Sequence, residues 1–130
     1  MNLLTKDIHE KNPKEIEERI KELDLILSKD EKNIEILLEK SSCLRHLDRY
    51  EDAIKVHNIL LKINPKDTDY LFMMGLVLIE ASQDEKAITY FDKIIKLDPK
   101  HRDAIFNKGL ALRKLGREKE AKAIMKDALK

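Results

Sequence analysis

The sequence predicts an all-α fold, an α-α superhelix or solenoid built from helix hairpins, and three observations lead to this class. First, leucine and alanine recur in step at one fixed spacing along the chain. The recurring residues are Leu44, Leu78 and Leu112, followed by Ala53, Ala87 and Ala121. Second, the apolar residues inside each period fall at helical intervals. Third, Pro65 recurs as Pro99 near the end of the period, where proline stops a helix. The period from Leu44 to Leu78, and again to Leu112, is 34 residues, a length typical of stacked repeats.

The first expected element is one helix within residues 12–33. Asn12 is the expected N-cap, Pro13 suits the first turn, and Glu15 can complete a capping box. The apolar stripe consists of Ile16, Ile20, Leu23, Ile26 and Leu27. We expect this segment to be the packing helix of a degenerate repeat. Residues 1–11, which precede it, are short and polar and are expected either to be flexible or to cover another surface of the protein.

Three helix pairs follow, in residues 34–67, 68–101 and 102–130. Within each pair, one amphipathic helix ends at a break near Asp48, Ser82 or Gly116, and a second amphipathic helix begins. Gly116 can take a positive φ, whereas Asp48 and Ser82 are expected to accept hydrogen bonds from the first turn of the next helix. No capping helix is expected after residues 102–130. The candidate oligomer face left there consists of Ile124, Met125 and Leu129.

The pattern of these pairs resembles the tetratricopeptide repeat (TPR) family over about residues 34 to 130. The middle pair carries Leu71, Met74, Gly75, Leu78, Ala87, Phe91, Ile94 and Pro99 in the order of the family pattern. The last pair carries Ile105, Lys108, Gly109, Leu112, Ala121, Met125 and Ala128. Small residues at the helix crossing (Ser41, Gly75 and Gly109) allow the two helices to touch. Four residues depart from the family: Arg19 replaces a usual alanine, His57 replaces a usual aromatic residue, and Leu60 and Ile94 replace a usual small residue.

The resemblance implies that the first helix of each pair lines a concave groove. The candidate groove residues are Leu38, Ser42, Phe72, Met73, Leu76, Phe106, Asn107, Leu110, Arg113 and Lys114. The apolar members from Phe72 to Leu110 would form a patch that fits a peptide or an amphipathic helix of a protein partner. Two alternatives stay open: these residues can belong to the core, or the N-terminal segment with Leu3, Leu4 and Ile8 can cover them.

The sequence therefore predicts a non-catalytic protein–protein interaction module. The alternative is a self-associating assembly protein, a homo-oligomer that forms through its uncapped C-terminal face or its groove. The two hypotheses differ in the residues that they require, because the first depends on Phe72 and Phe106 and the second on Ile124 and Met125.

Composition argues against the other function classes. The four histidines are isolated and the three glycines form no phosphate-binding loop, so we expect no enzyme, no metal and no cofactor. The 26 basic residues balance 25 acidic ones, and the excess of base is confined to residues 100–130, which argues against nucleic acid. The longest apolar run, residues 71–79, is too short to cross a bilayer, so no membrane partner is expected. The single Cys43 is ordinary for a reducing compartment, and we expect the cytoplasm.

Overall fold

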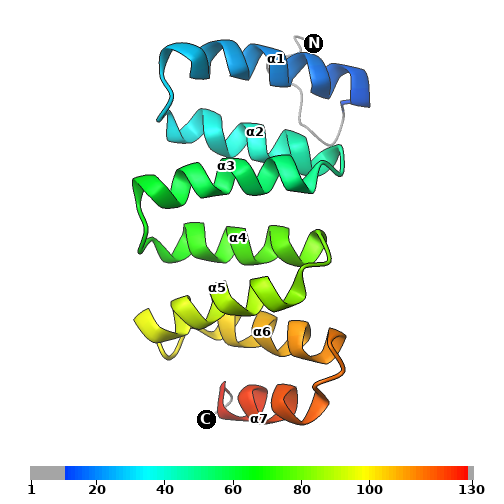
Figure 1. Ribbon diagram of the computed structural model, residues 1–130, viewed down its shortest axis with the longest axis vertical. Coiled ribbons are helices and arrows are strands. Elements are labelled where there is room, and N and C mark those ends of the chain that lie inside the picture. Colours follow the sequence, from blue (N-terminus) through cyan, green and yellow to red (C-terminus); the bar gives the residue numbers. More distant parts are fainter. Residues whose placement is uncertain (1–10, 129–130) are drawn as a thin grey trace. The chain divides into compact units, whose positions relative to one another are not determined.

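The computed structural model describes residues 11–128, and within this range the chain forms α-helices and no strand (Figure 1). The helices belong to two compact units, Met1–Ile63 and Asn64–Lys130, which we call the first and the second unit. Consecutive helices within each unit pack against each other as hairpins. The all-α class predicted from the repeat period is therefore confirmed.

The first unit contains α1 (Pro13–Lys29), α2 (Ile34–His46) and α3 (Tyr50–Ile63). The predicted cap of α1 is present, because the side chain of Asn12 accepts a hydrogen bond from the backbone N–H of Glu15 at 2.9 Å. Ile16, Ile20 and Leu23 are buried along one side of α1, as their spacing predicts. This helix thus packs on α2 with the first three residues of the predicted stripe buried, whereas Ile26 is 39% exposed.

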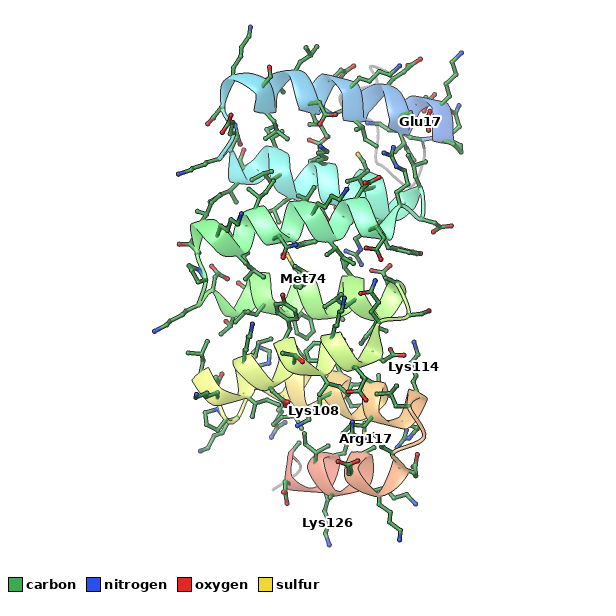
Figure 2. All side chains as sticks on the ribbon, in the orientation of Figure 1. Glu17, Met74, Lys108, Lys114, Arg117 and Lys126 are labelled. Carbon is green, nitrogen blue, oxygen red and sulfur yellow. The ribbon has the colours of Figure 1, made fainter. Side chains whose placement is uncertain are left out.

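The second unit contains α4 (Thr68–Glu80), α5 (Asp84–Leu97), α6 (Arg102–Lys114) and α7 (Glu118–Ala128). Basic side chains of this unit include Lys114 on α6, Lys126 on α7 and Arg117 in the connection between these helices (Figure 2). Arg117 is held in ion pairs with Glu120 at 2.8 Å and with Glu85 at 3.3 Å. The basic C-terminal segment is therefore, at this position, a solvated surface with acidic partners.

One N-cap position recurs with the period of the sequence. Asn33, Asp67 and His101 are equivalent in the repeat register, and each accepts a backbone hydrogen bond in the first turn of α2, α4 or α6. The three bonds measure 3.2, 3.1 and 3.0 Å. At His101 the acceptor is the ring nitrogen Nδ1, so the cap requires that this nitrogen carry no proton.

The breaks inside the hairpins share one backbone conformation. Asp48, Ser82 and Gly116 all have positive φ, at 57°, 61° and 78°. After each of them the next backbone N–H returns to the preceding helix, as from Arg49 to the carbonyl of Leu44 at 2.8 Å. The prediction that Asp48 and Ser82 cap the next helix is therefore wrong. They end the previous helix, because the tight turn needs a left-handed residue at this position whatever its side chain.

The helix crossing within each hairpin is formed by one small residue and one large residue. A Cβ atom placed on Gly75 would lie 2.5 Å from the Phe91 ring, and a Cβ on Gly109 would overlap Met125. In the first unit the equivalent residues are Ser41 and His57, which are both buried and share a hydrogen bond of 2.6 Å. Close approach of the two helices is thus common to all three hairpins, as predicted, while the chemistry of the contact differs.

Candidate functional site

The predicted apolar groove residues of the second unit lie on α4 and α6 and differ in exposure. Phe106 on α6 is 54% exposed and is one of the exposed large hydrophobic side chains of the protein. Phe72 on α4 is half-buried, with its ring 5.9 Å from the rings of both Phe91 and His101. The remaining apolar members, Met73, Leu76 and Leu110, are half-buried. Among the predicted apolar groove residues, Phe106 is therefore the exposed one and the other four are half-buried.

The polar candidates of the second unit have partners within the fold. The side-chain amide of Asn107 donates to the backbone carbonyl of Asp103 at 2.8 Å. Arg113 Nε lies 3.0 Å from Glu118, and Lys114 Nζ lies 4.0 Å from Asp84. Such exposed ion pairs contribute little to stability, but they reduce the free positive charge at this end of α6. The polar candidates are therefore engaged within the fold, whereas Phe106 remains exposed.

In the first unit, the candidate residues Leu38 and Ser42 lie on α2, half-buried and exposed respectively. Glu39 between them was not singled out in the sequence, yet it has the most defined environment of the three. The Arg19 guanidinium of α1 binds its carboxylate, with Nη2 at 2.9 Å, and lowers its pKa. The arginine that departs from the family pattern thus joins α1 to α2 through a paired charge.

The candidate oligomer face on α7 packs largely within the second unit. Ile124 is half-buried against a cluster formed by Ile88, Ala111, Leu112 and Ala121. Met125 is half-buried beside Gly109. Leu129 lies outside the described residues, as do Leu3, Leu4 and Ile8 of the N-terminal segment. The two described members of the face are therefore engaged in the hairpin of α6 and α7.

The Ser41–His57 pair combines two residue types that occur in nucleophilic catalysis, but its environment is that of a core contact. His57 is only 2% exposed, and its second ring nitrogen, Nδ1, has no hydrogen-bond partner within residues 11–128. Burial lowers the pKa of His57 to about 4, so the imidazole is neutral near pH 7. No substrate can approach the hydroxyl of Ser41, a residue that is itself 3% exposed. The pair therefore packs the two helices together.

No metal centre or membrane-spanning helix emerges from the described part of the chain. Within residues 11–128, His, Cys, Asp and Glu form no group of three or more that could hold a metal ion. Over the same range, no helix is both long enough and apolar enough to cross a membrane. Cys43 is buried, and burial raises the pKa of its thiol, which disfavours the reactive thiolate.

A protein family described as anaphase-promoting complex, cyclosome, subunit 3 matches residues 46–128. The chain belongs to this family. It is a family of TPR-type repeats, which confirms the resemblance inferred from the residues. TPR-type proteins are generally non-catalytic modules for protein–protein interaction or scaffolding, and the TPR-type fold of this chain suggests an interaction or scaffold role.

Solved structures of MamA have the same fold as this TPR protein. A crystal structure of MamA is 26% identical with a TM-score of 0.76, over 90% of this chain and 67% of that chain. A second MamA structure is 25% identical with a TM-score of 0.76, over 88% of this chain and 62% of that one. A third structure, of MamA from Desulfovibrio magneticus RS-1, is 17% identical with a TM-score of 0.76, over 93% of this chain and 76% of that chain. The TPR chain spans about two thirds of the first two MamA chains. No curated protein sequence matches it.

Proposed function

We propose that the chain is a protein-interaction module that binds a peptide or an amphipathic helix on the surface formed by α4 and α6. The observation that carries the proposal is the 54% exposure of Phe106, an aromatic side chain on the first helix of a TPR-type hairpin. Large apolar side chains that remain exposed in a folded domain mark interaction sites when they are surrounded by further apolar surface. Met73, Leu76 and Leu110 supply that surround.

Phe72 has a different role in this proposal, because its ring already contacts Phe91 and His101. A side chain fixed on two sides loses little conformational freedom when a partner binds, and preorganised anchors of this kind bind more tightly than mobile ones. The proposed site thus combines a rigid ring on α4 with a projecting ring on α6. Leu38 and Ser42 of the first unit, together with Asn107, Arg113 and Lys114, remain predicted contacts of a partner. The compartment we propose for this interaction is the cytoplasm.

The test uses the full chain as bait for a displayed library of random peptides, followed by fluorescence anisotropy with the selected sequences. Phe106→Asp should weaken their binding by about 30-fold, since loss of an aromatic hot spot costs roughly 2 kcal/mol or more. The matched control is Leu97→Asp, which charges an equally apolar and 47% exposed residue on α5 and should change affinity by less than about twofold. Peptides that bind both variants as well as the parent chain would overturn the proposal.

Self-association is the alternative, and it requires other residues. Light scattering of the parent chain would reveal an oligomer, which should be unchanged by Phe106→Asp if the α4/α6 surface is reserved for another protein. If Ile124 and Met125 form the working surface, their substitution should change the mass. Because both side chains already pack inside the second unit, the structure supports this alternative less than the first.

A further inference from the structure

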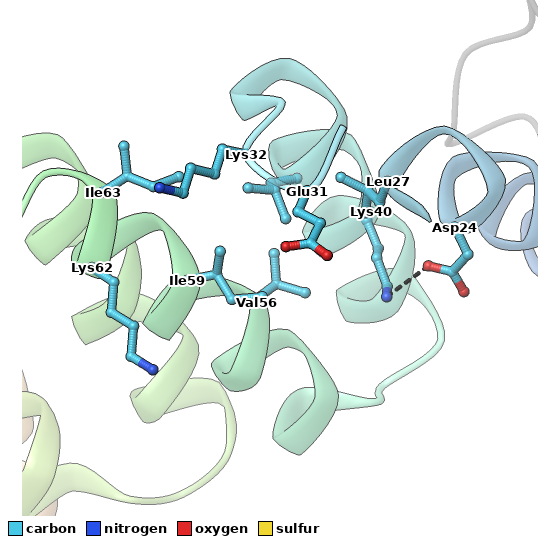
Figure 3. A pocket seen from close by; sticks show the side chains of 10 residues that line it. Asp24, Leu27, Glu31, Lys32, Lys40, Val56, Ile59, Lys62 and Ile63 are labelled. Atoms are coloured by element: carbon cyan, nitrogen blue, oxygen red, sulfur yellow. Dashed lines mark ion pairs between the residues drawn. The ribbon is translucent and has the colours of Figure 1, made fainter. Parts of the chain in front are cut away.

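A pocket of about 530 Å³ lies in the first unit, between α1, α2 and α3 (Figure 3). Its apolar lining consists of Leu27, Leu37, Val56, Ile59 and Ile63. Ile59 is 41% exposed, although it stands on the same helix as fully buried core residues. A volume of several hundred Å³ with an aliphatic lining is typical of sites that bind small molecules.

Two of the charged lining residues neutralise each other. Lys40 Nζ lies 2.7 Å from Asp24, an ion pair drawn in Figure 3 between α2 and α1. The same pair recurs two repeats later in the register, where Lys108 Nζ lies 2.6 Å from Asp92. Because it recurs in both units, the pair belongs to the packing of one hairpin on the preceding helix. It therefore contributes no free charge for a ligand.

Three charged residues of the pocket are left, and their balance is positive. Lys32 and Lys62 line the pocket from the α1–α2 connection and from the last turn of α3, and neither has an ion-pair partner within residues 11–128. Glu31 is the single acid, and Figure 3 shows its carboxylate directed between the side chains of the lining. An anionic group bound near the two lysines would gain two charge-assisted contacts, whereas a cation would meet only one.

The equivalent place in the second unit has a different lining, which argues that the pocket is particular to the first unit. In the repeat register, Val56 corresponds to the larger Ile124, and Ile59 corresponds to Asp127. Ile124 packs into the hydrophobic cluster of α6 and α7. An acid at the position of Ile59 would oppose both an aliphatic chain and a carboxylate.

We propose that the pocket binds an unbranched aliphatic chain that ends in a carboxylate, such as a medium-chain fatty acid. The chain lies over Ile59, Val56 and their aliphatic neighbours, and the carboxylate is held by Lys32 and Lys62. The site shares no residue with the α4/α6 surface, so the outcome of a ligand-binding test does not depend on the function proposed above.

Binding of decanoate to the full chain, measured by calorimetry and by methyl NMR, tests the ligand class. Octanoate should bind about 15-fold more weakly, because each buried methylene contributes about fourfold in affinity. Decyltrimethylammonium, with a tail of the same length, should bind more weakly than decanoate. Glu31→Gln should strengthen decanoate binding and weaken the cation. The affected methyl signals should be those of Val56, Ile59 and Ile63.

Variants at the pocket test the residues that carry the proposal. The double change Lys32→Glu and Lys62→Glu should weaken decanoate binding by about tenfold, since each exposed charge contact is worth up to roughly fivefold. The same changes at Lys66 and Lys96, which occupy the equivalent positions one repeat later, provide the matched control and should have an effect below about twofold. Ile59→Asp should abolish binding, whereas Leu97→Asp should not.

Thermal unfolding followed by circular dichroism confirms that each variant is folded before binding is measured. The proposal is overturned if decanoate and the cation bind equally well, if affinity does not rise with chain length, or if Ile59→Asp binds decanoate like the parent chain. Failure of decanoate to bind at millimolar concentration would overturn it as well. Retained binding in Phe106→Asp is expected, because that residue belongs to the other site.

Discussion

The buried Ser41–His57 pair makes the stability of the protein depend on pH. His57 has a pKa of about 4 in the fold, against an ordinary value of 6.5, because burial disfavours the imidazolium and Arg45 adds a repulsive positive charge. Between these two values the unfolded chain binds a proton that the folded chain does not. The stability that the protein has with His57 neutral is therefore fully present above pH 6.5, and it is lost as the pH falls toward 4. The difference between the two pKa values corresponds to about 3 kcal/mol.

A double variant isolates this contribution. Ser41→Gly with His57→Phe copies the Gly75–Phe91 contact of the next hairpin and removes the titrating group. Carboxylates elsewhere in the chain titrate in both proteins and cancel in the comparison. The advantage of the double variant over the parent chain should therefore grow by about 3 kcal/mol between pH 7 and pH 4. Urea unfolding followed by circular dichroism at several pH values measures it.

The single variant His57→Phe provides the control for packing. With Ser41 retained, the ring meets a side chain where the equivalent hairpin has none, so this variant should be about 1–3 kcal/mol less stable than the double variant at every pH. A stability difference between parent and double variant that stays constant from pH 7 to pH 4 would refute the reasoning. It would mean that His57 takes up its proton at the same pH in the folded protein as in the unfolded chain.

Three further predictions concern the glycines and the positive-φ residues of the hairpins. Gly75→Ala should lower the free energy of unfolding by about 1–3 kcal/mol, because the new methyl group would lie 2.5 Å from the Phe91 ring; an unchanged urea midpoint would contradict this. Ser82→Gly should raise the free energy of unfolding by about 1 kcal/mol, because Ser82 has a left-handed φ of 61° that costs an L-residue about 1–2 kcal/mol. Gly116 has a φ of 78° with no atom near the added Cβ, so Gly116→Ala should lower the free energy of unfolding by a similar amount. Thermal unfolding of Ser82→Gly and Gly116→Ala compares the two effects.

Much of the fold could be predicted from the sequence because period and helix signals agree. The Asn12 cap and the small residues at the crossings are found where their types predict them. The role of Ser82 was predicted wrongly because serine and aspartate are favoured both as N-caps and in turns, so residue type alone does not separate the two. The cap at His101 was missed since histidine is an uncommon cap, although its spacing from Asp67 would have identified it.

The candidate site was less accessible to sequence reasoning. The resemblance locates α4 and α6, but it cannot rank exposure, and only the structure separates the projecting Phe106 from the anchored Phe72. The partner of Lys114 is Asp84, at the start of the preceding helix, and no local pattern links the two. The pocket under Ile59 escaped notice for a similar reason, because a cavity depends on which side chains fail to fill a space.

The crossing contacts also bear on how such a chain can change by duplication. Glycine faces phenylalanine in one hairpin, glycine faces methionine in the next, and serine faces histidine in the first unit. Each matched pair is encoded within one short stretch of the sequence. A whole hairpin can therefore be copied, deleted or grafted with its contact intact, whereas a junction placed between Ser41 and His57 would unite mismatched halves. The ends of duplicated or deleted segments should accordingly lie in the connections between hairpins and not in the short turns within them.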